Sequence, residues 1–204
     1  MPRSEDILNS LHALANDYRA IAVSWHILSY LLIAFLILNW DPSNRLFGII
    51  LTLPVVSVAL FAWISGNPFN GTLFTILAVM FFLFALGSTS NPIGMASWPF
   101  LVIGIAMVLF GLVYPHFLET QSFIRYAIAS PFGLIPCPTL SVIIGFLLIY
   151  NSLGSHLVAL TLIIFGLFYG LFGAIKLRVY LDYFLIFGSL VLLVQFILMT
   201  RNPL

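Results

Sequence analysis

The sequence predicts an all-α fold, a polytopic transmembrane helical bundle, and three observations support this prediction. Hydrophobic residues make up 62% of the 204 residues and charged residues only 6%, whereas a soluble domain carries roughly 25% charged residues. The apolar residues gather in long runs, and a run of about 18 or more is typical of a membrane span. The runs are apolar throughout, unlike the alternating strands of a membrane barrel. Helices are therefore expected, because they satisfy their own backbone groups in lipid.

Seven apolar segments are long enough, or nearly so, to cross a hydrocarbon core of roughly 30 Å. They are residues 20–40, 46–65, 69–86, 98–116, 138–150, 157–175 and 180–199. The fifth segment is short, so either part of 132–137 enters the membrane with it or the segment is re-entrant. Residues 20–204 are thus predicted to form a single transmembrane helical domain.

Residues 1–19 precede the first span and predict a short amphipathic helix. Its apolar residues recur at three- and four-residue steps and share one face: Ile7, Leu8, Leu11, Leu14, Ala15 and Tyr18. Ser4 is the expected N-cap. Such a helix either lies in the membrane interface or packs on the cytoplasmic ends of the spans. No cleavable signal peptide is expected, because this segment is too long and too acidic.

Lys and Arg are distributed unequally over the two sides of a chain with seven spans. One side holds Arg3, Arg19, Arg125, Lys176 and Arg178, and the other holds Arg45 and Arg201. The excess predicts a cytoplasmic N-terminus and an outside C-terminus. The lipid bilayer is the predicted partner, and the net charge of +1 gives no reason to expect nucleic acid.

No acidic or basic side chain falls in the middle of a predicted span. Ion-coupled pumps and voltage sensors generally need such a charge at membrane depth. The sequence therefore favours passage of a neutral solute, or a nonconducting role, over a pump driven by a carboxylate. No catalytic motif is present, so enzymatic activity is not predicted.

The most distinctive motif is Phe-Gly-Leu-Ile-Pro-Cys-Pro-Thr at residues 132–139. Pro136 and Pro138 flank Cys137 and predict a stiff, non-helical lead-in to the fifth span, with Thr139 as its cap. A single cysteine excludes an internal disulfide. Cys137 is either a metal ligand or reactive thiol, or a small buried hydrophobe in a rigid turn.

Several polar residues from separated parts of the chain are predicted to lie toward the cytoplasmic face. The candidate site consists of His26, His116, Arg125, Cys137 and Asp182, with Tyr114, Tyr126 and Tyr183 as supporting donors. His26 lies about 9 Å inside the first span, where it is either functional or bonded across to another helix. Asp182 either belongs to the site or caps the last helix.

No cofactor is predicted from a motif, although a metal or haem remains the alternative. Two histidines and a cysteine, His26, His116 and Cys137, could ligate a soft metal, and a single histidine could bind haem. None of them has the spacing of a known metal motif such as HExxH.

Small and polar residues in the last two spans predict helix packing. Gly166, Gly170 and Gly173 share one side of the sixth span, and this spacing allows close approach of another helix. That helix belongs either to the same chain or to a second copy in a homo-oligomer. Gln195 is interpreted as a hydrogen bond between helices.

The motif at residues 132–139 resembles the hallmark of the domain of unknown function 6064 family, a group of uncharacterised small bacterial membrane proteins. Asp182-Tyr183, Asn67-Pro68 and the spacing of Tyr18, His26 and Tyr30 are also similar to that family's pattern. His26 stands where the family usually carries glutamine, and Phe61-Ala62-Trp63 stands in place of its aromatic and histidine motif. The resemblance implies a divergent bacterial inner-membrane protein and no established activity.

Two functional hypotheses follow from these patterns. The first is a multi-pass inner-membrane protein that passes or binds a small neutral solute, or serves as a subunit of a larger membrane assembly. The second is a membrane redox or metal/haem-binding protein that uses the histidines and the cysteine on the cytoplasmic side.

Overall fold

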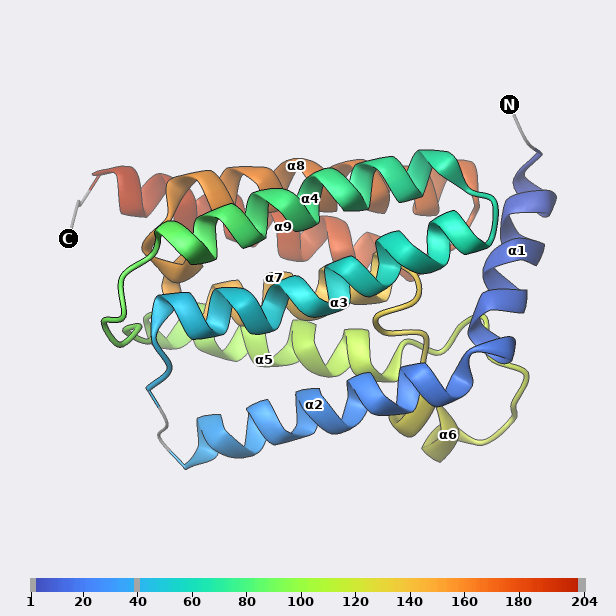
Figure 1. Cartoon of the computed structure of the whole chain (residues 1–204), viewed down its shortest axis with the longest axis horizontal. Coiled ribbons are helices and arrows are strands. Elements are labelled where there is room, and N and C mark those ends of the chain that lie inside the picture. The colour runs from blue at the N-terminus through green and yellow to red at the C-terminus, as the bar shows by residue number, and fades with distance from the viewer. Residues whose placement is uncertain (1–2, 39–40, 202–204) are drawn as a thin grey trace.

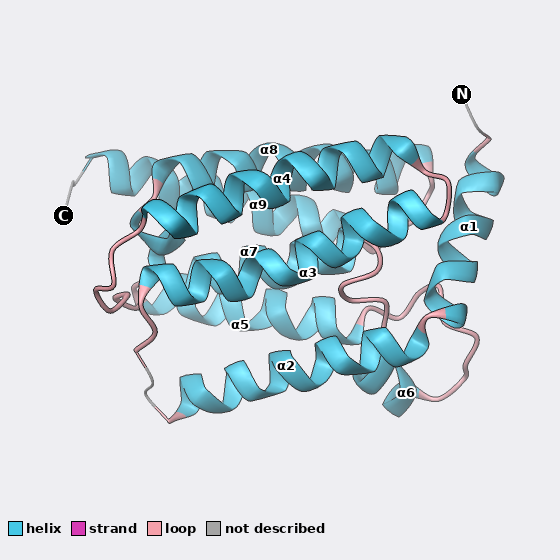
Figure 2. Ribbon diagram, viewed as in Figure 1, coloured by secondary structure: helices cyan, strands magenta, loops and turns pink. Residues whose placement is uncertain are grey.

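The computed structural model describes residues 3–38 and 41–201, and every regular element within these ranges is a helix (Figures 1 and 2). Seven apolar helices run along the long axis of the molecule. They are α2 (Arg19–Ile37), α3 (Asn44–Ile64), α4 (Pro68–Gly87), α5 (Trp98–Val113), α7 (Pro136–Ile149), α8 (His156–Leu171) and α9 (Asp182–Arg201). Helix α1 (Ser4–Asp17) lies across one end of the bundle, and the short α6 (Phe123–Ala129) lies at the same end. The prediction of a helical bundle is confirmed for the described residues.

Five of these helices are long and apolar enough to cross a membrane: α2, α3, α4, α9, and α8 together with the π-helical turn Phe172–Lys176 that continues it. Helices α5 and α7 are apolar but shorter, with 16 and 14 residues. Several long apolar helices in one chain give it the character of a multi-pass membrane protein.

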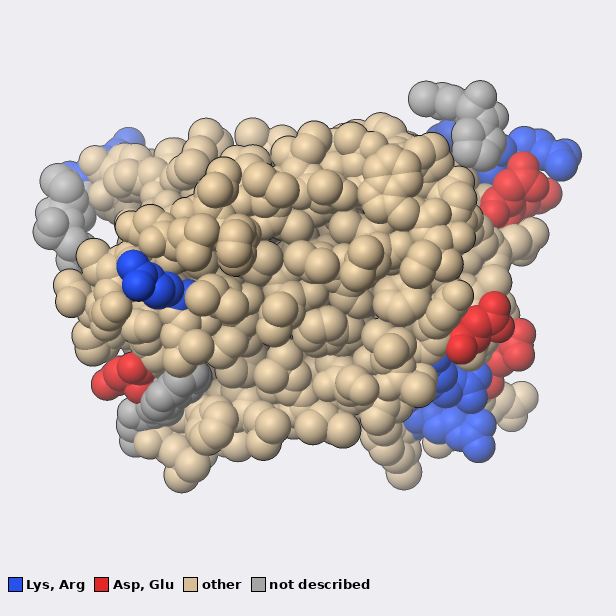
Figure 3. Space-filling view, viewed as in Figure 1, with Lys and Arg blue, Asp and Glu red and all other residues tan. Residues whose placement is uncertain are grey.

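The surface of the molecule is also typical of a membrane protein. Charged side chains gather at the two ends of the long axis, and the middle of the face in Figure 3 carries none. Large apolar side chains such as Leu31, Leu83 and Ile164 are at least half exposed on the flanks. Exposed apolar area on this scale is unfavourable in water and is expected where lipid surrounds a protein.

Helix α7 forms the centre of the bundle. All of its residues except the partly buried Cys137 are buried, as expected for a helix that is apolar all round. Residues 130–135, which precede it, are non-helical and also buried. Irregular backbone is tolerated at membrane depth only where protein encloses it. Because its neighbours enclose α7, its short length does not have to match the bilayer.

Glycines bring α5 and α7 into close contact. A Cβ atom at Gly104 would lie 2.6 Å from the carbonyl oxygen of Gly145, and one at Gly145 would lie 2.6 Å from that of Gly104. Two helical turns further along α5, Gly111 approaches the Pro138 carbonyl oxygen in the same way. The two backbones can touch only because these positions lack side chains.

Some predicted boundaries are wrong. Helix α5 ends at Val113, not at residue 116, because Pro115 excludes helical geometry at the residue before it. The link 118–136 contains α6, which the sequence did not predict. Residue Ser4 is not the N-cap: Arg3 occupies that position, and the Ser4 hydroxyl donates to the Lys176 carbonyl at 3.1 Å.

The proline motif also differs from its prediction. Pro136 is the first residue of α7, so Pro136, Cys137, Pro138 and Thr139 form its first turn and only 132–135 is non-helical. Proline suits this turn, because the missing N–H would have no helical partner there. Thr139 is not a cap; its hydroxyl donates to the Ile135 carbonyl at 2.7 Å and accepts from the Gly133 N–H at 2.9 Å. The predicted end of the first span, 39–40, lies outside the described residues.

Helix α1 packs against the end of the bundle. Leu11 and Ala15 belong to a buried apolar cluster with Tyr114, Phe117 and Leu177. Asn16 strengthens the contact by donating to the Phe117 carbonyl at 2.9 Å. These contacts match the alternative in which the helix packs on the ends of the spans.

Candidate functional site

Two of the predicted site residues, Cys137 and Asp182, lie together at one end of the bundle, and Tyr114 joins them. Tyr114 directly follows α5, Cys137 is in the first turn of α7, and Asp182 is the first residue of α9. The Tyr114 hydroxyl donates to Asp182 Oδ1 at 2.7 Å. The Cys137 thiol lies close enough to interact electrostatically with this carboxyl group, and its Sγ donates a long hydrogen bond to the Tyr169 carbonyl oxygen at 4.0 Å. Tyr114 and Asp182 are at most 1% exposed.

A glycine makes room for the carboxyl group. A Cβ atom at Gly173 would lie 1.7 Å from Asp182 Oδ2, so no other residue fits there without moving Asp182. Gly173 lies in the π-helical turn Phe172–Lys176. Turns of this type are rare and are often found at functional sites.

The other two predicted packing glycines also face α9 of the same chain. A Cβ atom at Gly166 would lie 2.1 Å from the Ser189 hydroxyl, and one at Gly170 would lie 2.6 Å from the Ile186 side chain. The glycine face of α8 is therefore occupied within the chain, which leaves it unavailable as a seam between two copies.

Asp182 has no cationic partner in the described part of the chain. The ion pairs found there join Arg3 to Asp6 and His12 to Glu119. A buried carboxyl group that has lost water needs hydrogen-bond donors, a cation or a proton in its place. Burial, followed by the nearby Cys137 and Asp182, raises the pKa of Tyr114 far above its usual 10.0. The phenol therefore keeps its proton and acts as a donor to Asp182.

His26 is buried at a different place. Its Nδ1 lies 2.7 Å from the Ala22 carbonyl oxygen and its Nε2 lies 2.8 Å from that of Leu112. A neutral imidazole has a single N–H, so it can bond one of these oxygens, whereas an imidazolium can bond both. The Ser130 hydroxyl also donates to the Leu112 carbonyl, at 2.9 Å. His26 thus ties α2 to the end of α5, and no hydrogen bond joins it to Asp182 in the described structure.

His116 lies in the loop after α5 and is half-buried. Its ring meets Phe117 edge-on, with centroids 4.2 Å apart. Burial, followed by the proximity of His12, lowers the pKa of His116 from its usual 6.5. This residue belongs to the contact between α1 and the bundle, not to the Asp182 cluster.

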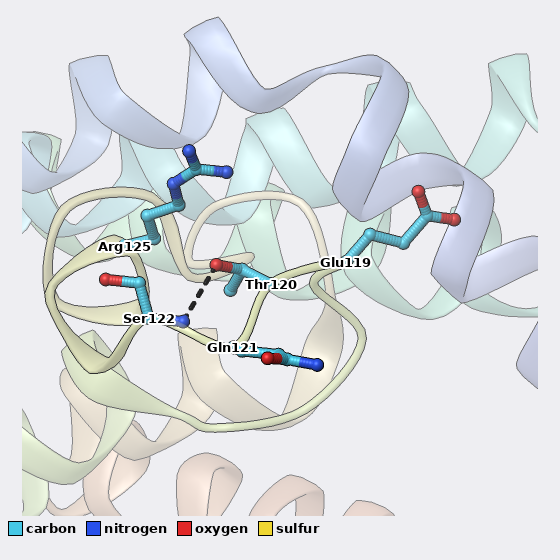
Figure 4. A pocket seen from close by; sticks show the side chains of 5 residues that line it. All are labelled: Glu119, Thr120, Gln121, Ser122 and Arg125. Carbon is cyan, nitrogen blue, oxygen red and sulfur yellow. Dashed lines mark hydrogen bonds between the residues drawn. The ribbon is translucent and has the colours of Figure 1, made fainter.

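Arg125 and the supporting tyrosines Tyr126 and Tyr183 do not join the cluster either. Arg125 is exposed and lines a shallow, open hollow with Glu119, Thr120, Gln121 and Ser122 (Figure 4). Tyr126 donates to the Leu118 carbonyl at 3.3 Å. Tyr183 is 54% exposed and stacks in parallel on Tyr180, with ring centroids 6.4 Å apart.

The hypothesised metal site does not form in the described residues. Within 3–38 and 41–201, no group of three or more His, Cys, Asp or Glu side chains could hold a metal ion. His26, His116 and Cys137 have separate environments, as their contacts show.

Polar side chains continue from the cluster along the interior faces of α7 and α9. Ser141 follows Cys137 by one helical turn and therefore shares its face; it is fully buried, and its hydroxyl has no hydrogen-bond partner among the described residues. On α9, Ser189 is fully buried and its hydroxyl donates to the Leu185 carbonyl at 2.8 Å. Neither serine was predicted to be functional, because isolated serines in apolar runs are common. The four-residue spacing from Cys137 was the one available signal for Ser141.

No protein-family model, curated protein or solved structure matches the chain. The resemblance to the domain of unknown function 6064 family therefore stays a prediction.

Proposed function

We propose that the protein is a seven-span membrane protein that moves a small neutral solute in step with a proton bound at Asp182. The observation that carries this proposal is the buried Asp182 carboxyl group, which accepts a hydrogen bond from Tyr114 and has no cationic partner among the described residues. The sequence disfavoured a pump driven by a carboxylate because no acidic residue lies in the middle of a predicted span. Asp182 is at the start of α9 and not in its middle, but it is buried, and an ionisable residue buried inside a membrane protein is costly and usually serves function.

Two features support the seven spans and their orientation. The short helices α5 and α7 lie alongside the five long ones, and α1 and the end of α9 lie at opposite ends of the long axis (Figure 1). The excess of Lys and Arg at the α1 end favours a cytoplasmic location for it. A bacterial inner membrane is the location that the family resemblance implies.

Reporter fusions after Leu118 and after the last residue test this topology. Seven spans require a cytoplasmic signal at the first position and an outside signal at the second. Cytoplasmic signals at both positions would exclude seven spans.

The surroundings of Asp182 suit a group that gains and loses a proton. Tyr114 keeps its proton and can bond either form of the carboxyl group, because a protonated carboxyl retains an acceptor oxygen. The serines at 141 and 189 extend the polar interior away from Asp182. Asp182 and Ser189 are separated by about 10 Å along α9, so a proton moving between them requires water or a change in the packing of α7, α8 and α9.

Infrared spectroscopy of the purified protein tests proton binding directly, because a protonated carboxyl group has a carbonyl stretch that a carboxylate lacks. We expect a band that appears as the pH is lowered, disappears in Asp182→Asn and shifts in Tyr114→Phe. Asp17→Asn, at an exposed aspartate near the same end, is the matched control and should leave the band unchanged. The absence of any band that depends on Asp182 over the stable pH range would overturn the proposal.

Reconstitution in liposomes then separates transport from a purely structural role in an assembly. Transport requires a proton flux when the solute is present, and Asp182→Asn should abolish that flux. If the protein only supports an assembly, the wild type and Asp182→Asn should co-purify with the same partners, and neither should show a proton flux.

A further inference from the structure

An open groove lies at the opposite end of α9 from Asp182. It has a volume of about 430 Å³, within the range of small-molecule sites. Three parts of the chain line it: the link before α5 with the start of that helix, the link between α7 and α8, and the end of α9. The lining residues are Met95, Ala96, Ser97, Phe100, Asn151, Gly154, His156, Gln195, Leu198 and Met199.

The lining determines what kind of ligand fits. It contains no Asp, Glu, Lys or Arg, so the one lining side chain that could compensate the charge of an ionic ligand is His156, and that imidazole is charged only when protonated. Methionine, leucine and phenylalanine side chains provide apolar contact, while Ser97, Asn151 and Gln195 provide polar groups. This combination favours an uncharged molecule with one polar end and one apolar end.

Gln195 is the polar group best fixed in position. It is 1% exposed; its Nε2 donates to the Leu148 carbonyl at 3.0 Å, and its Oε1 accepts from the Ser152 hydroxyl at 3.0 Å. A carboxamide has two N–H donors and an oxygen with two lone pairs. One donor and one lone pair of Gln195 therefore have no partner among the described residues. Each of the two atoms thus has one partner and one free position, and because Gln195 lines the groove, a ligand there could occupy both.

We propose that this groove binds an uncharged primary carboxamide with a compact apolar arm. The ligand's own amide offers an acceptor oxygen to the free Gln195 N–H and a donor to its free lone pair, and its arm lies against the methionines and Phe100. This ligand class specifies the solute of the proposed function. Only the transport of the ligand rests on that function. Binding itself involves residues at the other end of α9 and does not require Asp182.

Saturation-transfer NMR on the full chain in detergent tests the proposal, with benzamide as the probe and with benzylamine and benzoate as charged controls. We expect saturable binding of benzamide and no saturable binding of either charged analogue. Gln195→Leu should weaken benzamide binding by on the order of tenfold. Gln121 lies in the shallow hollow at the α6 end, so Gln121→Leu is the matched control and should bind like wild type.

A second variant keeps the test decisive if Gln195→Leu fails to fold. Leu198 lines the groove and is 45% exposed, so Leu198→Trp fills the groove without breaking the bonds of Gln195, and it should abolish binding. No benzamide binding to wild type, equal binding of the charged analogues, or unchanged binding in both variants would overturn the proposal. Asp182→Asn should bind benzamide normally, so a failure of proton binding at Asp182 would be distinguishable from a failure of this site.

Discussion

The Tyr114 hydroxyl donates to Asp182 Oδ1 at 2.7 Å and so joins the end of α5 to the start of α9 across 68 residues of sequence. Tyr114→Phe removes this donor and keeps the ring. We expect it to lower the free energy of unfolding by about 1–3 kcal/mol, because a buried oxygen loses a hydrogen bond. Unfolding by denaturant in detergent micelles measures this change.

Tyr169→Phe is the control for Tyr114→Phe. Tyr169 is also buried, and its hydroxyl donates to Asn70 Oδ1 at 3.0 Å. Both variants should be less stable than wild type, but only Tyr114→Phe should shift the carboxyl band of Asp182. An equal shift in both variants would mean that the band reports general packing and not this bond.

Gly173→Ala should displace the Asp182 carboxyl group, because the new Cβ would lie 1.7 Å from Oδ2. Overpacking of this kind typically costs about 1–3 kcal/mol. Gly87→Ala is the control, since no described atom lies within 4 Å of its added Cβ; alanine is the better helix former, so stability should hold or rise. Thermal unfolding of both variants is the measurement, and a Gly173→Ala protein as stable as Gly87→Ala would show that the turn relaxes freely.

Ser141→Ala should raise the free energy of unfolding, by up to about 1–3 kcal/mol, because it removes a buried hydroxyl without a described partner. Ser189→Ala is the comparison, since that hydroxyl is bonded to the Leu185 carbonyl and its removal should not stabilise the fold. If the Ser141 hydroxyl serves proton movement, the stabilised variant should also lose proton flux. Destabilisation by Ser141→Ala would indicate that the hydroxyl is bonded in the membrane, for example to water.

The helices were largely predictable because apolar runs of about 20 residues leave a chain few alternatives in lipid. The proximity of Cys137 to Asp182 was also predictable from the sequence, since both residues lie in the first turns of helices that begin at the same end of the bundle. The prediction did not identify Tyr114 as the residue that bonds Asp182, and it grouped His26 and His116 with them. Topology gives the depth of a residue, whereas the contacts depend on the direction in which each helix face points.

Other features had no distinctive sequence signal. Gly104 and Gly145 are 41 positions apart and belong to different helices, so their contact follows from the packing of α5 on α7 and not from a local motif. Helix α6 is a single short segment among polar residues, with no long apolar run to reveal it. The central position of α7 likewise depends on how the other six helices surround it, although its uniformly apolar composition is consistent with burial.

His116 should make the stability of the protein depend on pH. Burial and the proximity of His12 lower the pKa of His116 in the folded protein, so the unfolded chain binds more protons between that lowered pKa and the usual 6.5. The free energy of unfolding should therefore fall as the pH drops below about 6.5, and this contribution should level off below the folded-state pKa. Unfolding measured at steps between about pH 7.5 and about pH 5 tests the direction. His116→Gln should flatten this part of the profile and His12→Gln should reduce its slope, because His12 contributes to the shift; an unchanged profile in His116→Gln would assign the dependence to other groups.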